Sequence, residues 1–398
     1  GGNYIEKEKG IYEITQVEAK KKHTKNIISY SSGSICDNYL VTKAYGRGKI
    51  IQVWSWPELN YIGDFLNRGR EHSEFLTVNW CERGAEDRVN LYDIQNRRLR
   101  SYAVDKDTVI LKNEYPLIGE NRNDKSMLKP FVAAMQIRDG IFVLRASESR
   151  YDELSVVNLA GGEELALYED IMPRSADADQ YLEYNYLMST NSEYIVKAYE
   201  NYNRLEILKI TDGYQIVPKV VIWGDERTVD LEHFYYNDVV CAEKIFLALH
   251  TPKGSENSII EIYDYAGNML GNLDVGMYFT NIEYDEYLGR IGVGRVIRGT
   301  VKSGQSVAVC HKDGTSTNVK IAKLFMYKGL KRYEAESAQV GDIIQVAGLS
   351  ELEIGETACD TAHIEPLPFV KIDEPTLAMN FMVNNSPFAG KDGKFVTS

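Results

Sequence analysis

Basic side chains gather in the last third of the sequence, where their type and spacing suit binding to phosphate groups. Lysine and arginine neutralise phosphate charge, which gives binding that is sensitive to salt and insensitive to nucleotide sequence. The alternative is a solvated strand face on which lysines protect an exposed sheet edge from pairing with other chains. The side chains taken as candidate RNA contacts are Arg295, Arg298, Lys320, Lys323, Lys331 and Arg332.

The overall charge is opposite to that of a dedicated nucleic-acid binder. The 398 residues carry a formal net charge of −13, whereas such binders are usually basic. Any RNA contact must therefore come from a local patch. No run of about 18 apolar residues occurs, so we expect no membrane span. The sequence begins at Gly1 without the basic and apolar segments of a signal peptide, which we expect to be absent or already removed.

Residues suited to catalysis or metal binding are not grouped in the sequence. The histidines follow no serine or cysteine motif that would pair a base with a nucleophile. Asp177 and Asp179 have the spacing of two calcium ligands but lack the glycine and closing glutamate of a calcium loop. We therefore predict no catalytic residue, no cofactor and no metal site. The histidines considered are His23, His72, His233 and His250.

The cysteines predict free thiols. There are five of them, an odd number, and they are widely spaced without a Cys-x-x-Cys motif. This pattern is typical of buried thiols and not of a disulfide framework or a zinc site. The positions are Cys36, Cys81, Cys241, Cys310 and Cys359.

The first 284 residues contain a repeated pair of short β runs joined by a turn. Asparagine, aspartate and glycine stand at most of these turns, because they accept the positive φ of a tight hairpin. A second recurring unit, apolar and bounded by Asn, Asp or Glu, lies between the hairpins at 36–44, 137–145, 190–198 and 241–249. The paired runs are 50–54 with 59–63, 88–92 with 98–102, 154–157 with 164–167, 204–208 with 214–217, and 258–263 with 268–273.

The two units together give about four strands per repeat. Propeller blades have about 40 to 50 residues, so this region holds roughly six. A propeller closes on itself and leaves few exposed strand edges. The sequence pattern at 260–270 resembles that of bacterial cell-envelope six-bladed propellers of the TolB-like or NHL-like kind. That resemblance implies a ligand at one end of the channel: a peptide, a glycan or a partner protein.

The residues from Arg290 onward predict a second, smaller all-β domain. Short strands are expected at 291–297, 306–311, 318–325 and 342–347, with a tight hairpin at 312–315. Glycine recurs between them, and it allows a strand to bend sharply in a small closed barrel.

This part of the sequence resembles a known family. The segments 294–307, 338–344 and 354–360 resemble the second-domain barrel of translational GTPases, and 372–398 resembles the BipA/TypA family at the start of its third domain. That family acts on ribosomes as a GTPase related to elongation factor G, and its second domain contacts the small ribosomal subunit. The resemblance implies a β-barrel over 285–370, after a propeller over 1–284. The first-strand stub of a truncated α+β domain follows at 371–398.

The motifs for GTP binding are missing. A phosphate-binding loop requires Gly-x4-Gly-Lys-Ser/Thr, and guanine recognition requires Asn-Lys-x-Asp; neither occurs. The segment 264–267 fits Asp-x-x-Gly but falls in a predicted hairpin turn, and 390–394 has the wrong spacing. We therefore expect neither GTP binding nor hydrolysis.

The junction near residue 285 has no linker rich in Pro, Gly or Ser. Natural two-domain proteins usually have one, so we hypothesise a chimeric fusion. We expect 1–30 to supply the strand that closes the propeller; otherwise both halves would compete for 291–297.

Three functional hypotheses remain. The first is a non-catalytic binding protein, with the propeller as an interaction module of the cell envelope. The second is a ribosome-associated translation-factor fragment, which would be cytoplasmic. The third is a propeller hydrolase with an unrecognised site.

Overall fold

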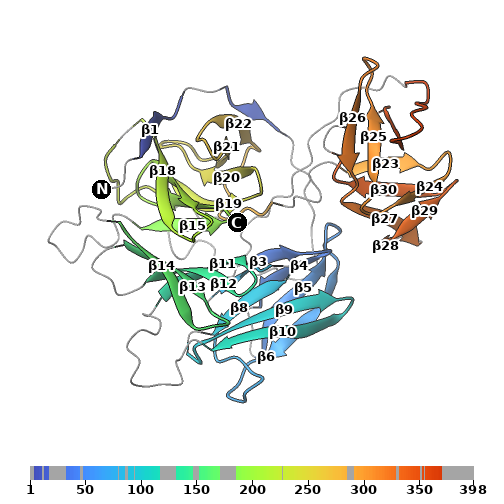
Figure 1. Ribbon diagram of the computed structural model, residues 1–398. Helices are drawn as coiled ribbons and strands as arrows, with labels where there is room; N and C mark the ends of the chain where they lie inside the picture. The colour runs from blue at the N-terminus through green and yellow to red at the C-terminus, as the bar shows by residue number, and fades with distance from the viewer. Residues whose placement is uncertain are drawn as a thin grey trace. The chain divides into compact units, whose positions relative to one another are not determined.

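The structure is a computed structural model, and every regular element in its described part is a β-strand (Figure 1). The described residues up to Tyr284 form one compact unit, and those from 291 to 369 form a second. The described residues are 4–10, 13–17, 33–44, 48–78, 80–85, 88–93, 95–116, 131–146, 152–170, 185–225, 227–284, 291–328, 331–349, 352–353 and 355–369. The stub predicted at 371–398 lies outside them.

In the described residues the first unit has five sheets, blades 1 to 5 in chain order, and each contains four consecutive antiparallel strands. Blade 1 has β3 (Gly33–Cys36), β4 (Tyr39–Lys43), β5 (Lys49–Ser55) and β6 (Tyr61–Asn67). Blade 2 has β7 (Trp80–Arg83), β8 (Val89–Asp93), β9 (Arg98–Asp105) and β10 (Thr108–Pro116). Blade 3 has β11 (Phe131–Arg138), β12 (Ile141–Ala146), β13 (Asp152–Asn158) and β14 (Glu163–Asp170). Blade 4 has β15 (Tyr186–Thr190), β16 (Tyr194–Tyr199), β17 (Arg204–Ile210) and β18 (Ile216–Trp223), and blade 5 has β19 (Tyr236–Cys241), β20 (Ile245–His250), β21 (Ile259–Asp264) and β22 (Met269–Asp274).

This arrangement is a β-propeller. The first strands of successive blades lie side by side, as in β3 with β7, β11 with β15, and β15 with β19. Apolar layers fill the seams between blades, so a middle strand is buried on both faces. In β17, Leu205 and Ile207 pack toward blade 5, whereas Leu208 and Ile210 pack toward blade 3. Burial on both faces explains the apolar runs in these strands.

The predicted hairpins are confirmed. All five paired runs are adjacent antiparallel strands: β5 with β6, β8 with β9, β13 with β14, β17 with β18, and β21 with β22. Asp264 and Gly267 lie in the turn between β21 and β22, where the Asp264 Oδ1 accepts a hydrogen bond from the Asn268 N–H at 2.8 Å. The all-β class and the propeller are thus confirmed, and the count of six blades stays a prediction.

The N-terminal segment adds strands to the outer edges of two blades. Strand β1 (Ile5–Glu8) pairs in parallel with β18, and β2 (Thr15–Gln16) pairs in parallel with β22. The segment therefore reaches blade 5, the last blade in the described part. The first barrel strand, β23 (Ile291–Arg295), pairs with β30 inside the second unit and with no blade strand in the described part of the chain.

The second unit is a small barrel with three sheets. The first has the order β23, β30 (Ile343–Ala347), β27 (Lys323–Lys328) and β28 (Lys331–Glu334). The second pairs β24 (Thr300–Lys302) with β29 (Ser337–Gln339). The third has the order β26 (Ser316–Lys320), β25 (Ser306–Cys310) and β31 (Thr357–Asp360). The three sheets enclose a core that contains Leu324, Ile344 and Val346.

Gly348 shows why the barrel needs glycine at its bends. It follows β30 with φ +94°. A Cβ at this position would lie 2.7 Å from both the backbone nitrogen and the Cβ of Ala322. Only glycine accommodates both the positive φ and this close approach. In the described part of the chain, no helix is long and apolar enough to cross a membrane.

Candidate binding sites

The structure distributes the candidate RNA contacts over two sheets of the barrel. Arg295 ends β23, Lys323 begins β27, and Lys331 and Arg332 begin β28, all in the four-stranded sheet. Lys320 ends β26 in the three-stranded sheet. Arg298 lies in the connection between β23 and β24. Four of the six residues therefore belong to a single sheet.

Two of the candidate cations form ion pairs with carboxylates. Arg298 pairs with Glu365, and both side chains are 70% exposed. The Lys323 Nζ lies 3.4 Å from Glu334, and the lysine side chain is only 14% exposed. An exposed pair contributes at most about 1 kcal/mol, so Arg298 can exchange its carboxylate for phosphate at little cost. Arg295 and Lys320 are both exposed.

The same four-stranded sheet carries exposed apolar side chains that sequence analysis missed. Arg295 lies opposite Ile343, and Val293 lies opposite Gln345. Gln345 in turn donates a hydrogen bond to the Tyr327 hydroxyl at 2.8 Å. Val293 is 67% exposed, Ile343 59% and Tyr327 46%. We call this surface, made by Val293, Arg295, Tyr327, Ile343 and Gln345, the barrel face.

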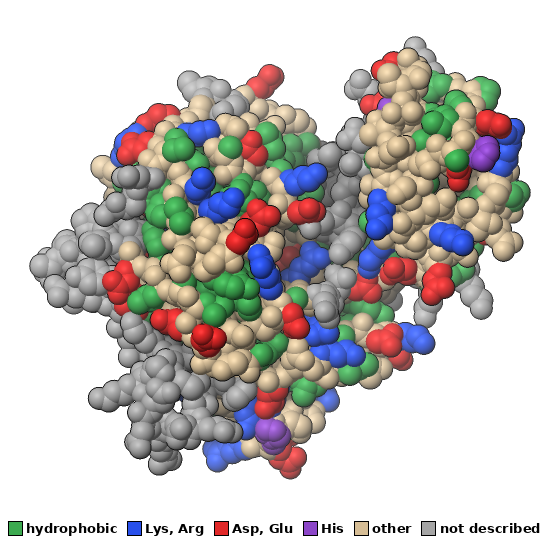
Figure 2. Space-filling view, viewed as in Figure 1, with side chains coloured by type: hydrophobic (Ala, Val, Ile, Leu, Met, Phe, Trp, Pro, Cys, Tyr) green, Lys and Arg blue, Asp and Glu red, His purple; other side chains and the backbone are tan. Residues whose placement is uncertain are grey.

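Basic and acidic side chains are interspersed over the side of the molecule seen in Figure 2. On this side, neither sign of charge dominates one large area, so a charged ligand would need a local feature to bind. The barrel face is such a feature, because it combines a guanidinium, a phenol ring and apolar side chains.

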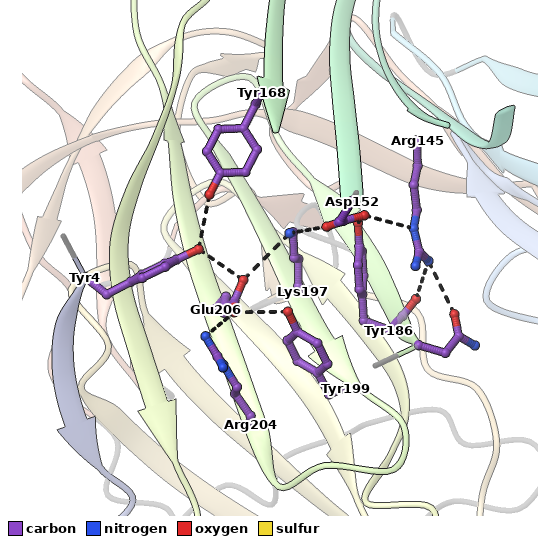
Figure 3. A network of polar contacts seen from close by, with 10 residues as sticks. Tyr4, Arg145, Asp152, Tyr168, Tyr186, Lys197, Tyr199, Arg204 and Glu206 are labelled. Carbon is purple, nitrogen blue, oxygen red and sulfur yellow. Dashed lines mark hydrogen bonds and ion pairs between the residues drawn. The ribbon is translucent and has the colours of Figure 1, made fainter. Parts of the chain in front are cut away.

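A buried polar network joins blades 3 and 4 (Figure 3). The Lys197 Nζ lies 2.6 Å from the Asp152 carboxylate and 3.7 Å from that of Glu206. Lys197 and Glu206 are both fully buried. The Tyr186 hydroxyl donates to Asp152 at 2.6 Å, and the Tyr199 hydroxyl donates to Glu206 at 3.0 Å. We call these five residues the seam network.

Two arginines complete the charge balance of the seam network. Arg145 lies 3.6 Å from Asp152, and Arg204 pairs with Glu206. Burial by itself would raise the pKa of Asp152, but Lys197 and Arg145 lower it below its usual value. The Asp152 carboxylate thus remains ionised beside Lys197 and Arg145. Such a closed arrangement suits a structural role, because each charge already has its partners.

Strand pairing explains how the seam network forms. Lys197 and Glu206 are direct partners across β16 and β17. Asp152 comes from β13 of blade 3, so the network crosses from one blade to the next. A sequence signal was available: Lys197 and Glu206 are charged residues inside apolar runs, and such residues are buried only when paired.

A second buried network joins blades 4 and 5. The Lys9 Nζ donates to Glu261 and to the Tyr236 hydroxyl, both at 2.8 Å. His250 lies 3.6 Å from the same carboxylate. Burial and the charge of Lys9 lower the pKa of His250 to about 3, so its ring is neutral. The Tyr263 hydroxyl also donates to Glu261.

Partly buried carboxyl groups lie on the first strands of blades 2 and 5 and on the segment that follows blade 5. Burial raises the pKa of Asp238 on β19 to about 7. Burial and the nearby Asp238 raise the pKa of Glu283 to about 8. Burial also raises the pKa of Glu82 on β7, with Glu283 adding to the effect. Asp238 holds the segment, because its Oδ2 accepts a hydrogen bond from the Ile282 N–H at 2.8 Å.

The histidines are only partly brought together. His233 and His250 lie on either side of Tyr235, at ring-centroid distances of 4.5 and 6.4 Å. Their ring nitrogens lie within hydrogen-bond distance of the backbone carbonyls of Thr251 and Tyr235. His72 lies between β6 and β7, is exposed, and is 3.9 Å from Glu114 of blade 2. His23 lies outside the described residues. That this chain has no enzymatic activity stays a prediction.

Four cysteines are free thiols, as predicted: Cys36, Cys241, Cys310 and Cys359. Cys310 and Cys359 lie on paired strands with their sulfur atoms 3.7 Å apart. Burial and the adjacent Cys359 raise the pKa of Cys310 to about 11. Within the described ranges, no three His, Cys, Asp or Glu side chains are grouped as a metal site. Asp177 and Asp179 lie outside those ranges.

Comparison with solved structures gives matches that share little sequence identity with this chain. The chain aligns with a putative exported protein from Bacteroides fragilis at 9% identity and a TM-score of 0.42, over 81% of this chain and 88% of that one. It also aligns with the WD40 domain of Toxoplasma gondii coronin at 11% identity and a TM-score of 0.41, over 84% and 83% of the two chains.

Sequence comparison gives much higher identities for the barrel region. Residues 289–359 match the family model for elongation factor Tu domain 2. The large ribosomal subunit assembly factor BipA of Bacillus subtilis is 51% identical over 117 residues, which are 29% of this chain and 19% of that protein. BipA of Escherichia coli K12 is 47% identical over 122 residues, 31% and 20% of the two chains. The chain thus spans about a fifth of the length of these relatives. The predicted resemblance of the C-terminal part to the BipA/TypA family is therefore confirmed.

Proposed function

We propose that this chain is a non-catalytic binding protein whose propeller is a protein-interaction module and whose barrel binds ribosomal RNA. The observation that supports the RNA contact is the barrel face. Exposed Arg295 lies opposite exposed Ile343, beside Val293 and Tyr327. Arginine pairs with phosphate, and a tyrosine ring stacks on an unpaired base. Apolar neighbours exclude water from such contacts.

The relatives supply the class of partner. BipA is named as an assembly factor of the large ribosomal subunit. We transfer to this chain only the ribosomal nature of the partner, because the matched region is the barrel. The sequence contains neither a phosphate-binding loop nor a guanine-recognition motif. The proposed binding therefore does not involve GTP.

The acidic chain makes the proposed contact local and sensitive to salt. With a net charge of −13, long-range attraction to RNA is weak. A protein that neutralises about two phosphates loses roughly tenfold in affinity between 50 and 200 mM salt. Arg298 can contribute after it releases Glu365, whereas Lys323 is largely covered.

Co-sedimentation of the full chain with purified ribosomes at 50 and 200 mM salt tests this proposal. We expect binding at the lower salt and a loss of about tenfold or more at the higher. The double variant Arg295→Glu with Tyr327→Ala should lose most of the binding at both salts. Lys112→Glu, an exposed position on β10 of the propeller, is the control for a matched charge change. Equal binding by the barrel-face variant and the control would refute the proposed RNA contact.

A further inference from the structure

Strand β1 lies at the outer edge of blade 4, and the residue at each of its ends is inserted into a seam between blades. It pairs in parallel with β18 over only four residues, from Ile5 opposite Val220 to Glu8 opposite Trp223. The middle buries little, because Ile5 is 62% exposed and the side chain of Glu8 65%. A short parallel strand at a sheet edge with so little burial has a low free energy of local opening.

The Tyr4 end is inserted into the seam between blades 3 and 4. Its hydroxyl donates to the Glu206 carboxylate at 3.1 Å and lies 3.4 Å from the Tyr168 hydroxyl (Figure 3). Its ring packs against the apolar layer of that seam. Tyr4 thereby contacts the seam network directly.

The Lys9 end is inserted into the next seam, between blades 4 and 5. Its Nζ donates to Glu261, to the Tyr236 hydroxyl and, at 3.2 Å, to the Asn203 side chain. The Lys9 side chain is 14% exposed, and that of Glu261 is 2% exposed. Tyr4 and Lys9 are five residues apart, and side chains alternate along a strand, so the two point to opposite faces of blade 4.

We propose that the outer edge of blade 4 is a strand-acceptor site, which recognises an extended segment with a tyrosine and a lysine five residues apart. Its occupant is the segment 4–9 of this chain, bound within one molecule here and exchangeable with that of a second copy. The backbone of β18 supplies affinity, and the two seams supply specificity, as in other cases of β-strand addition. This proposal concerns the propeller only and is independent of RNA binding by the barrel.

The exposed middle of the strand adds an electrostatic contact. Arg227 pairs with both Glu6 and Glu8, and its side chain is 46% exposed. Such exposed pairs contribute little at physiological salt. Discrimination between segments is therefore expected to come from Tyr4 and Lys9 and to depend weakly on salt.

Release of the segment is expected to raise the pKa of His250. Glu261 would lose its ion pair with Lys9. The His250 imidazole, 3.6 Å away, is a neighbour of Glu261 that can become positively charged. The Tyr236 and Tyr263 hydroxyls also contact this carboxylate, and His233 is a further titratable group near His250. His250 would then take up a proton more readily, because the positive charge of Lys9 no longer opposes it.

The test uses the full chain and a fluorescent peptide of residues 3–10. In the chain with Tyr4→Phe and Lys9→Met, the weakened internal segment should compete less. We therefore expect this variant to bind the wild-type peptide at least tenfold more tightly than the unsubstituted chain does. Peptides with Lys9→Met or Tyr4→Phe should bind at least tenfold more weakly than a control peptide with Ile5→Ala, a change at an exposed position.

Two controls make the result decisive. Near-ultraviolet circular dichroism establishes that the doubly substituted chain is folded; if it is not, the single variant Lys9→Met replaces it. Histidine NMR should show the pKa of His250 moving upward in the Lys9→Met chain and downward again when peptide binds. A folded variant that binds no peptide, or that binds all peptides equally, would overturn the proposal.

Discussion

Lys197 lies directly opposite Glu206 across β16 and β17, and both side chains are fully buried at the seam between blades 3 and 4. A third charged group, Asp152, reaches them from blade 3, with its carboxylate 2.6 Å from the Lys197 Nζ. This placement makes one lysine the shared partner of two carboxylates from different blades. The packing of the blades therefore depends on its charge.

Lys197→Met should destabilise the propeller strongly. It leaves Asp152 and Glu206 with less compensation in a buried seam, and loss of one partner of such a network costs about 3–5 kcal/mol. Urea unfolding followed by tryptophan fluorescence measures the change. Lys112→Met, an exposed position on β10, should change the free energy of unfolding by less than about 0.5 kcal/mol. Similar effects of both substitutions would contradict this role of Lys197.

Stability should fall as pH rises from about 6.5 to 8.5. The pKa of Asp238 is raised to about 7 and that of Glu283 to about 8. In this window the folded chain retains protons that the unfolded carboxyl groups have already lost, so folding weakens as pH increases. The loss should be on the order of 1–3 kcal/mol. Urea titrations of Asp238→Asn and Glu283→Gln should show a flatter dependence; an unchanged slope in both would count against the assignment.

At lower pH, the contribution of His250 to stability should change with pH in the opposite direction. Its pKa is lowered to about 3, so between about pH 4 and 6 the unfolded chain binds a proton that the folded chain does not. Its contribution to stability therefore rises with pH across this window. Subtracting the unfolding free energies of His250→Gln from those of the unsubstituted chain isolates this contribution. A difference that stays constant with pH would show that His250 is not neutral in the folded chain.

Gly348→Ala should destabilise the barrel. The added Cβ would meet Ala322 at 2.7 Å with the backbone at φ +94°, and together the contact and the strain should cost more than about 2 kcal/mol. Thermal unfolding measures the loss. Gly294→Ala is the matched control, because nothing lies within 4 Å of a Cβ there. Its effect should stay within about 1 kcal/mol.

The local strand pairings could be predicted because their causes are local. Asp264 and Gly267 satisfy a turn between β21 and β22, and the same reasoning holds for glycine and asparagine at the other hairpins. The alternation and continuity of apolar residues then define strands that are buried on both faces. The barrel was recognisable for a different reason, since its segments are similar to those of a known family.

The sites could not be predicted in this way, because their members are far apart in the sequence. Tyr4 meets Glu206 across 202 positions, and Lys9 meets Glu261 across 252. The apolar surroundings of Glu206 and Glu261 signal that each needs a partner. Only the packing of blades decides which residue that partner is. The barrel face likewise depends on strand order, which places Arg295 of β23 beside Ile343 of β30. The sequence alone thus determines the strands and their turns, whereas tertiary structure decides which side chains share a seam or a surface.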